Sequence, residues 1–586
     1  MSRQPVYLGI DFGTTKSAVA YLQPGQSEGK LLLIEYPPMI PSSLTLNADQ
    51  KKFWLVDFGQ TAKYKEHKDH ALFRRFKLSL GRPSLDLPDS NPSAYAAIKP
   101  EEVAAVYLRR LRLEAKDALE RQQLPLPDSV TISVPAGWDP QQKQATKYAA
   151  LLAGFEDVNL CEEPLAALDH VLTTKPSLWK NLGAATEKIM VIDFGGGTCD
   201  IAVLKVSRER HFFPRRQPTF RAQVLYSHAN THLGGELVDD CILRWIKASE
   251  EAKGISLHKQ HKKASAFKKN LNEGMKSDAG VVPNQHRPTS VAEFLDLKYS
   301  DELTEPIPGE NLEFSANWLH TRLSKTPCIE LKDQSIIKAF AYLVEKTINQ
   351  CGGVEQINRI FLVGGSSHLY FVEPIVKILF PDLAGMDYIE QTAHPEEDVV
   401  LGACLHEAQR HTHHLPFKPR LFYGLSLVEE VTASGGAPEP HPTGEPARIK
   451  LLRRGKSWPL PIKEARSSWF RVTKPISELN IKIDGVGEHP TQPTLQAFKK
   501  LKTLDGSQIQ PNERLWTSTQ VSQDGIIKIK IVGPNNRLRM VTVEEYPLNG
   551  KEFIDRRDHF QSMFMDNGGN DGTPLDPLLG DLDKGG

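Results

Sequence analysis

Two glycine-rich turns, far apart in the chain, have the same surroundings. Each consists of an apolar run, an aspartate, a glycine turn with threonine and a second apolar run, at residues 11–15 and 193–200. A third glycine turn follows at residues 364–367. One such turn alone is also typical of a tight β-hairpin, but the matched pair predicts two related lobes that face one another. We therefore expect a duplicated α/β fold with a ligand between its halves.

The residue types in these turns suit a nucleotide phosphate that is bound together with magnesium. Glycines let backbone N–H groups approach an anion closely, and threonine hydroxyls add further donors. An aspartate at a strand end can hold Mg²⁺ through retained waters, because this ion dehydrates reluctantly. The turns thus predict a site for ATP or ADP with Mg²⁺.

Composition narrows the function classes further. The 586 residues are 40% hydrophobic and 25% charged, with a formal net charge of zero, so the chain offers no electrostatic case for nucleic acid or an anionic membrane. The sequence shows neither an N-terminal apolar signal segment nor an apolar run long enough to span a bilayer. We expect a cytoplasmic protein. None of the six cysteines forms a Cys-x-x-Cys motif, so the sequence suggests neither a zinc site nor a redox pair.

Six ordered segments resemble the 70-kDa heat-shock protein (DnaK-type) chaperones. The segments span residues 9–15, 134–146, 162–167, 193–198, 231–236 and 362–367. The resemblance implies a two-lobed actin-like ATPase built from duplicated βαβ domains, with a small all-β domain of the substrate-binding kind after it. The last third of the chain resembles the family more weakly, at residues 451–459 and 523–531.

The same resemblance, with the helix and strand patterns, predicts the domain limits. Helices are expected at residues 100–121 and 141–153, and short strands separated by turns are expected after residue 421. The linker has few apolar residues, and comparison with the family's pattern implies that the chain ends too soon for a helical lid. The expected parts are ATPase lobe I at 1–182, lobe II at 183–411, a linker at 412–420, a β-sandwich substrate or partner domain at 421–560 and a disordered tail at 561–586.

The resemblance also assigns roles in ATP hydrolysis. Lys77 matches the family's active-site lysine, and Glu163 matches the glutamate between the lobes. Asp11 and Asp193 would hold Mg²⁺ through water, and Thr198 completes the catalytic set. The residues expected to bind the phosphates are Gly13, Thr14, Thr15, Gly195, Gly196, Gly197, Gly234, Gly235 and Glu236.

The nucleoside end of the site is less well matched. His368 stands where the family has an arginine, and it is still able to stack on adenine. Glu273 and Lys276 fit the spacing of a Glu and a Lys that the family supplies from one helix, but Lys268 and Lys269 fit nearly as well. The remaining candidates are Gly364, Gly365, Ser366 and Glu396.

Two further positions match a relay between the nucleotide and the substrate domain. Pro135 matches the family's proline, and Lys143 stands in place of its arginine. Because lysine lacks the planar, two-pronged contact of arginine, the coupling is expected to differ.

The sequence favours an ATP-dependent chaperone-like protein that couples ATP binding and hydrolysis to unfolded or extended peptides. The family implies a J-domain cochaperone and a nucleotide exchange factor as partners. The alternative is an ATP-gated scaffold that holds one dedicated protein, with a β domain kept for docking. A small-molecule kinase of the same superfold is a third possibility, since fold does not fix function.

Overall fold

The computed structural model describes most of the two lobes and part of the C-terminal third. The described residues are 6–49, 52–64, 70–82, 85, 92–175, 186–208, 220–248, 257–276, 287–306, 313–386, 388–411, 424–428, 431–433, 448–452, 462–466, 470–472, 475, 477–484, 499–503, 508–511, 513–521, 527–533, 538–542, 548 and 550–566. The expected linker at 412–420 lies outside them. Among the described helices, none combines the length and apolar character that a bilayer crossing requires.

The central sheets of the two lobes have the same strand order, which confirms the duplication. In lobe I the order is β3-β2-β1-β8-β9, with β4 (Ile40–Pro41) beside β2. In lobe II it is β12-β11-β10-β15-β16. Each sheet joins an antiparallel hairpin to parallel strands that follow helical crossovers. The strands are β1 (Tyr7–Phe12), β2 (Lys16–Leu22), β3 (Lys30–Leu31), β8 (Ser129–Val134), β9 (Asp157–Glu162), β10 (Glu187–Phe194), β11 (Cys199–Arg208), β12 (Phe220–Asn230), β15 (Arg359–Val363) and β16 (Ile389–Gln391).

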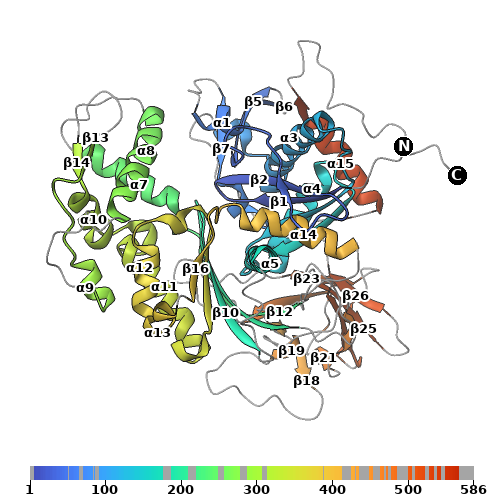
Figure 1. Cartoon of the computed structure of the whole chain (residues 1–586). Coiled ribbons are helices and arrows are strands. Elements are labelled where there is room, and N and C mark those ends of the chain that lie inside the picture. The colour runs from blue at the N-terminus through green and yellow to red at the C-terminus, as the bar shows by residue number, and fades with distance from the viewer. Residues whose placement is uncertain are drawn as a thin grey trace.

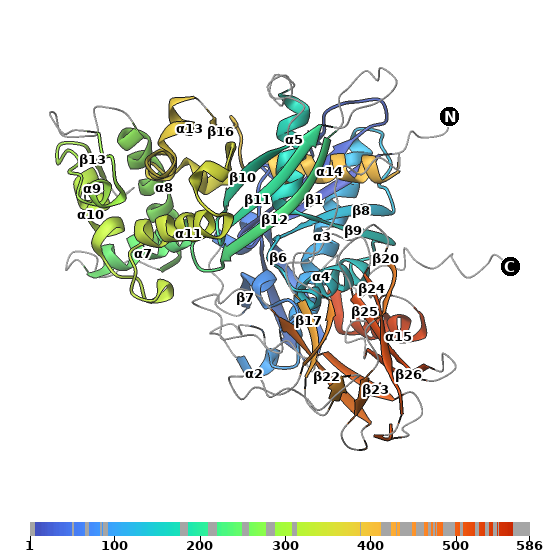
Figure 2. The ribbon, with the colours of Figure 1, turned by 90° about the horizontal axis from the view of Figure 1, so that it is seen from below.

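Two helices cross between the lobes and lie side by side in both ribbon views (Figures 1 and 2). The first, α5 (Glu163–Thr174), follows the lobe I sheet but buries apolar side chains against the lobe II strands. The second, α14 (Asp398–His411), follows the lobe II sheet but packs on β1 and β2. A Cβ on Gly402 would lie 1.8 Å from the Ala166 carbonyl oxygen, so the two helices touch through their backbones. This exchange ties each lobe to the other.

The other elements of lobe I cover its sheet and build a smaller one. The expected helix 100–121 is confirmed as α3 (Pro100–Arg121), and the second expected helix is α4 (Pro140–Leu152). Asp139 caps α4 by accepting from the backbone N–H groups of Gln141 and Gln142. The remaining elements are α1 (Gly59–Tyr64), α2 (Pro92–Tyr95), β5 (Ser43–Asp49), β6 (Lys52–Phe58), β7 (Ala71–Arg74) and the 3₁₀ turn η1 (Phe76–Ser79).

Lobe II adds a helical layer, which lies to the left in Figure 1. Its core joins the strands β10 and β11 to apolar faces of α7 and α11. The elements are α7 (Gly235–Ala248), α8 (Leu257–Lys276), α9 (Val291–Leu295), β13 (Thr304–Pro306), β14 (Glu313–Ser315), α10 (Ala316–Lys325), η4 (Ile329–Leu331), α11 (Ile336–Cys351), η5 (Val354–Gln356), η6 (Gly365–His368), α12 (Val372–Leu379) and α13 (Pro381–Gly385).

The expected β domain forms an antiparallel module below lobe I in Figure 1. Eight strands make one sheet in the order β19-β17-β22-β23-β26-β25-β24-β20, and β18 pairs with β21. The strands are β17 (Gly424–Val428), β18 (Val431–Ala433), β19 (Arg448–Leu452), β20 (Ile462–Arg466), β21 (Phe470–Val472), β22 (Glu478–Asp484), β23 (Lys499–Thr503), β24 (Trp516–Val521), β25 (Ile527–Val532) and β26 (Leu538–Thr542).

The chain then returns to lobe I, which corrects the expected limits after the β module. A boundary at 560/561 would cut α15 (Gly550–Met563), and residues 561–566 are ordered rather than part of a disordered tail. The strand β27 (Phe564–Asp566) pairs in parallel with β6. Phe560 and Phe564 are buried in the lobe I core, with the Phe564 ring centroid 5.3 Å from that of Phe53. The remaining tail, 567–586, lies outside the described residues.

Candidate functional site

The glycine turns of the two lobes touch each other. A Cβ on Gly196 would lie 2.0 Å from Thr15 Oγ1, and one on Gly197 would lie 2.7 Å from Thr14 Cγ2. No other residue fits at these distances, so the glycines are required for the contact itself as well as for the turn. Gly13 is similarly close to the backbone of its own turn. The structure thus brings together the two turns that the sequence predicted to meet.

The start of α7 and the third glycine turn complete this contact. The backbone N–H of Glu236 donates to the Gly196 carbonyl at 2.7 Å, and that of Gly235 donates to the Gly195 carbonyl at 3.2 Å. Gly364 has a left-handed φ of +80°, and a Cβ there would lie 2.3 Å from Asp193 Oδ1. Gly234 lies against the same turn. All three sequence motifs therefore converge at the ends of β1, β10 and β15.

A buried ion pair lies at the lobe I side of this junction. Lys77, in η1, places its Nζ 2.8 Å from Glu163 Oε1 at the start of α5, and the two side chains are only 2% and 8% exposed. The lysine ammonium also lies 5.2 Å from the ring centroid of Trp138. Burying a lysine this deeply requires an anionic partner, and Glu163 supplies it.

Three further carboxyl groups surround the pair. Ser133 donates to Asp11 Oδ1 at 2.5 Å, and Asp193 and Asp200 face each other across the β10–β11 hairpin. Burial, followed by the nearby Glu163 carboxylate, raises the pKa of Asp11 to about 6. The same two causes raise the pKa of Asp200 to about 7, and burial raises the pKa of Asp193 well above its usual range.

This charge arrangement fits a magnesium-bound phosphate. Four carboxyl groups, at Asp11, Glu163, Asp193 and Asp200, share one buried lysine, Lys77. Asp200 Oδ1 is buried without a hydrogen-bond partner among the described residues. An added divalent cation would lower the cost of ionising these carboxyls. Oxygen atoms of carboxyl groups are the ligands that Mg²⁺ prefers. The positive charge of a bound Mg²⁺ ion would balance the negative charge of these carboxylates.

The candidates for the nucleoside end lie around η6. Ser366 Oγ would be 2.3 Å from a Cβ on Gly235, so this turn lies against the start of α7. Burial and the Lys276 ammonium lower the pKa of His368, whereas Glu396 and Glu273 oppose that shift. The four charged or titratable candidates are therefore close enough to influence one another. Glu273 and Lys276 also form a 3.7 Å ion pair at the surface.

The structure gives Lys268 a place that the sequence left open. Its Nζ donates to the Gly235 carbonyl at 3.0 Å and pairs with Asp239 at 2.8 Å. Of the α8 lysines considered, Lys268 thus contacts Gly235, whereas Lys276 lies close enough to His368 to lower the pKa of that histidine. The residues of the two spacings thus lie at different ends of the candidate site.

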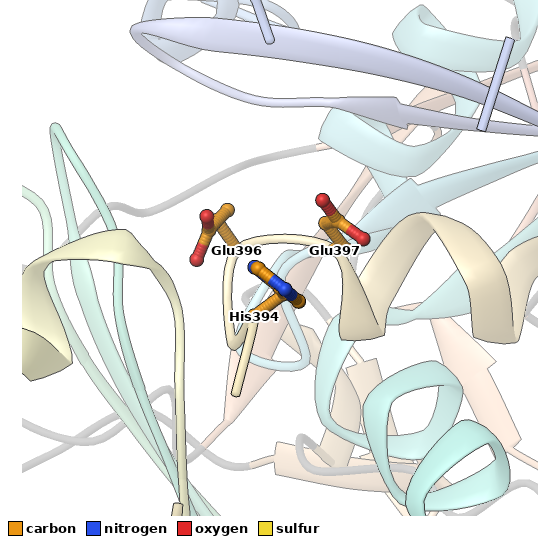
Figure 3. A group of neighbouring side chains, drawn as sticks. All are labelled: His394, Glu396 and Glu397. Atoms are coloured by element: carbon orange, nitrogen blue, oxygen red, sulfur yellow. The ribbon is translucent and has the colours of Figure 1, made fainter. Parts of the chain in front are cut away.

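Glu396 belongs to a small acidic group in the turn before α14. The potential ligand atoms of His394, Glu396 and Glu397 all lie within 4.8 Å of one another, and Figure 3 shows the glutamates on either side of the histidine. His394 is exposed and both glutamates are partly exposed. A Cβ on Gly365 would contact Glu396 at 3.6 Å, which places this turn beside the nucleoside candidates.

Of the two positions predicted to act as a relay, Lys143 lies next to the buried ion pair, and the Pro135 carbonyl accepts from the Trp138 backbone N–H at 3.1 Å. Lys143 of α4 forms a 2.8 Å ion pair with Glu162, which directly precedes Glu163. Lys143 is 6% exposed. The adjacent residues Glu162 and Glu163 therefore each pair with a buried lysine, Lys143 of α4 and Lys77 of η1 respectively.

Several residues of the site were missed from the sequence. Ser133 holds Asp11, and Asn272 joins α8 to η6 by donating to the His368 carbonyl at 2.9 Å and accepting from the Tyr370 N–H at 2.7 Å. Asp200 is the last residue of the second glycine turn, 193–200, so its position in that motif could have identified it. The positions of Ser133 and Asn272 in the site depend on contacts between distant segments, which no local sequence pattern reveals.

Comparisons with known proteins agree with this architecture. The family model described as "Hsp70 protein" matches residues 61–280. The chaperone protein DnaK of Thermosipho melanesiensis is 25% identical over 417 residues, covering 70% of this chain and 60% of the relative. That of Prochlorococcus marinus is 30% identical over 434 residues, covering 68% and 58%. A chaperone protein HscA homolog of Acinetobacter baylyi is 26% identical over 429 residues, covering 68% and 57%.

The chain spans about three fifths of the length of these curated relatives. The family-model match at residues 61–280 includes strands of both duplicated sheets. The family-model match and the identities of 25% to 30% support the chain as a divergent member of the Hsp70 family.

Proposed function

We propose that the protein is a Mg²⁺-dependent ATPase that hydrolyses ATP to ADP and phosphate between its two lobes. The observation that carries the proposal is the buried Lys77–Glu163 pair among Asp11 and Asp193, placed where the glycine turns of both lobes touch. Phosphoryl transfer to water needs positioning and charge stabilisation more than covalent chemistry. This centre offers both.

Each group has a definite task in this proposal. The backbone N–H groups and hydroxyls of the two glycine turns would hold the phosphate oxygens. Asp11 and Asp193 would hold Mg²⁺ through waters, and the bound ion would neutralise phosphate charge. Lys77 would place a fixed cation near the γ-phosphate, while Glu163 would orient the attacking water. Thr198, which hydrogen bonds to Asp200, would keep that carboxyl away from the phosphate.

A bound nucleotide would draw the two lobes together, because its phosphates and its nucleoside would contact residues of both lobes. Lys63 of α1 already pairs with Glu236 of α7 at 3.2 Å across the lobes, and α5 and α14 cross between them. A change in lobe angle would reach the β module through the Lys143–Glu162 pair beside the site. A two-state device of this kind is what allosteric coupling requires.

We propose chaperone-like use of this cycle, with unfolded or extended peptides as clients in a cytoplasmic protein. The support is the DnaK and HscA names of the relatives together with the antiparallel β module. Peptides would add to strand edges and fill apolar pockets. A J-domain cochaperone and an exchange factor would regulate the cycle.

One observation favours the alternative, an ATP-gated scaffold with a single dedicated partner. The segment after the β module docks on lobe I through β27 and the buried Phe560 and Phe564. A module held to lobe I at its C-terminal end has less freedom to change between two binding states. The scaffold would use the nucleotide to hold or release one protein.

Single-turnover ATP hydrolysis with a panel of unrelated unfolded peptides separates these functions. Phosphate release that depends on Mg²⁺ and is accelerated by diverse peptides supports the chaperone-like cycle. Turnover that ignores every peptide supports the scaffold. A phosphorylated metabolite in place of free phosphate, or no turnover with Mg²⁺ and ATP, would contradict the proposed ATPase.

A further inference from the structure

Two cysteines of lobe II, 87 residues apart in sequence, meet in the fold. The Sγ atoms of Cys241 in α7 and Cys328 just before η4 lie 3.6 Å apart, and both thiols are free. A disulfide has an S–S length of about 2.05 Å, so the sulfurs need to approach by roughly 1.5 Å. No spacing motif marks this pair, since the two thiols come from separate elements.

The two thiols have different charged neighbours. Arg244 Nη2 donates to Cys241 Sγ at 3.2 Å, whereas the Cys328 thiol donates to Glu330 Oε2 at 2.8 Å. Arg244 and Glu330 are themselves paired at 3.1 Å. The contact with Cys328 and the Arg244 charge lower the pKa of Cys241, and the contact with Cys241 and burial raise that of Cys328. Of the two thiols, Cys241 is thus the one that loses its proton more readily, and the thiolate is the form that attacks an oxidant.

The pair lies directly beneath the surface. Both cysteines are 3% exposed, but the Arg244 and Glu330 side chains that contact them are 46% and 38% exposed. The other cysteines lack such an environment: burial raises the pKa of Cys351 to about 11, and it also raises those of Cys161, Cys199 and Cys404. A small oxidant therefore has one favourable thiol to attack.

We propose that Cys241 and Cys328 form a reversible disulfide when the protein meets a hydroperoxide such as hydrogen peroxide. The Cys241 thiolate attacks a peroxide oxygen, so that an S–O bond forms, the O–O bond breaks, and the leaving hydroxide takes a proton to become water. Cys328 then gives its proton to Glu330 and attacks the Cys241 sulfenic sulfur. The S–S bond forms, the S–O bond breaks, and the second hydroxide leaves as water with that proton.

Two sulfurs thus supply the two electrons that reduce one peroxide to two waters. A soluble dithiol reverses the reaction by thiol–disulfide exchange. The disulfide joins α7, whose first residues contact the turn at 195–197, to the connection between α10 and η4. The inference does not depend on the proposed ATPase, because it concerns only thiol chemistry within lobe II.

The test treats the folded, fully reduced chain with hydrogen peroxide, then unfolds it and counts its thiols. We expect the count to fall from six to four, and mass spectrometry of unreduced peptides to find residues 241 and 328 linked. Cys328→Ser should stop at a sulfenic acid that dimedone traps at Cys241. Cys351→Ser is the matched control, and it should still form the link.

A variant that leaves both cysteines in place tests the charged environment. Arg244→Met should slow the loss of thiols several-fold, while Arg244→Lys should retain most of the rate. The proposal is overturned if no 241–328 link forms, if Cys351 or another cysteine reacts first, or if Cys241→Ser loses thiols as fast as the wild type. The Arg244 series keeps the test valid even if a cysteine substitution impairs folding.

Discussion

The two ends of the candidate nucleotide site are built differently. At the phosphate end, the turns of both lobes are in contact and Lys77 is buried against Glu163. At the nucleoside end, Ser366, His368 and Glu396 are partly exposed, and the exposed side chains of Glu273 and Lys276 pair with each other. The phosphate end carries a set of buried ionisable groups, whereas the ion pair at the nucleoside end lies at the surface.

This difference suggests separate tasks for the two ends: phosphate chemistry at the buried end and recognition of the nucleoside at the exposed end. Buried, fixed charges act strongly because little water screens them, while exposed pairs contribute little. We expect the phosphate end to control magnesium binding and hydrolysis, and the nucleoside end to make a smaller contribution to affinity. The following predictions compare the two ends, beginning with the largest effect.

A methyl group at the lobe contact should have the largest effect. In Gly196→Ala the new Cβ would lie 2.0 Å from Thr15 Oγ1, which forces the turns apart. We expect affinity for ADP with Mg²⁺ to fall by at least about a hundredfold, or roughly 2.8 kcal/mol, in calorimetric titration. Gly365→Ala is the matched change at the nucleoside end, where the Cβ meets Glu396 at 3.6 Å. A larger loss in Gly365→Ala would reverse the comparison.

Removal of magnesium should weaken the binding of ligands that carry phosphates but leave the binding of the nucleoside alone unchanged. Since the buried carboxyls around Asp11 and Asp193 need a cation beside the phosphates, chelation should weaken ADP binding by about tenfold or more. Adenosine, which has no phosphate, should bind equally well with and without the ion. Equal losses for both ligands in the same titrations would place the metal away from the phosphate end.

Loss of the ring at position 368 should weaken binding only modestly. His368 is partly exposed, and stacking of such a ring contributes about 0.5–1.5 kcal/mol. His368→Ala should therefore bind ADP about two- to tenfold more weakly, and pyrophosphate equally well, in competition assays. A matching loss for pyrophosphate would show that His368 acts on the phosphates instead.

The ion pair between the lobes should have the smallest effect. Lys63 and Glu236 lie 3.2 Å apart with side chains 16% and 21% exposed. Solvent-exposed pairs contribute about 0.2–1 kcal/mol, and this partly buried pair is expected at the upper end of that range. Lys63→Met should therefore reduce ADP affinity by at most about fivefold, with only weak dependence on salt because the pair is partly buried. A loss as large as that of Gly196→Ala would assign Lys63 a direct contact with the ligand.

The sequence allowed prediction of those parts of the fold that repeat. The aspartates at 11 and 193, with their glycine turns, predicted the duplicated sheets and the contact between them, and the structure confirms both. Lys77 and Glu163 were chosen by resemblance, and they form the buried pair at that contact. The roles of these residues in catalysis stay predictions.

Contacts between distant segments were beyond the reach of local patterns. Residues 561–586 were expected to form a disordered tail, so the ordered strand β27 within them was not predicted. Its partner β6 lies at the other end of the sequence, and three residues are too few to show a period of two. The Cys241–Cys328 contact was missed for the same reason, because only tertiary packing of α7 on the segment before η4 creates it.

The most direct test of the phosphate end is single-turnover hydrolysis of ATP by wild type and Lys77→Ala, with ADP affinity measured on each. Lys276→Ala serves as the control for losing a lysine at the exposed end. We predict that Lys77→Ala retains ADP binding and slows the chemical step by about a hundredfold or more, while Lys276→Ala hydrolyses ATP at nearly the wild-type rate. An unchanged rate in a folded, ADP-binding Lys77→Ala protein would contradict the assignment of the buried lysine to the reaction.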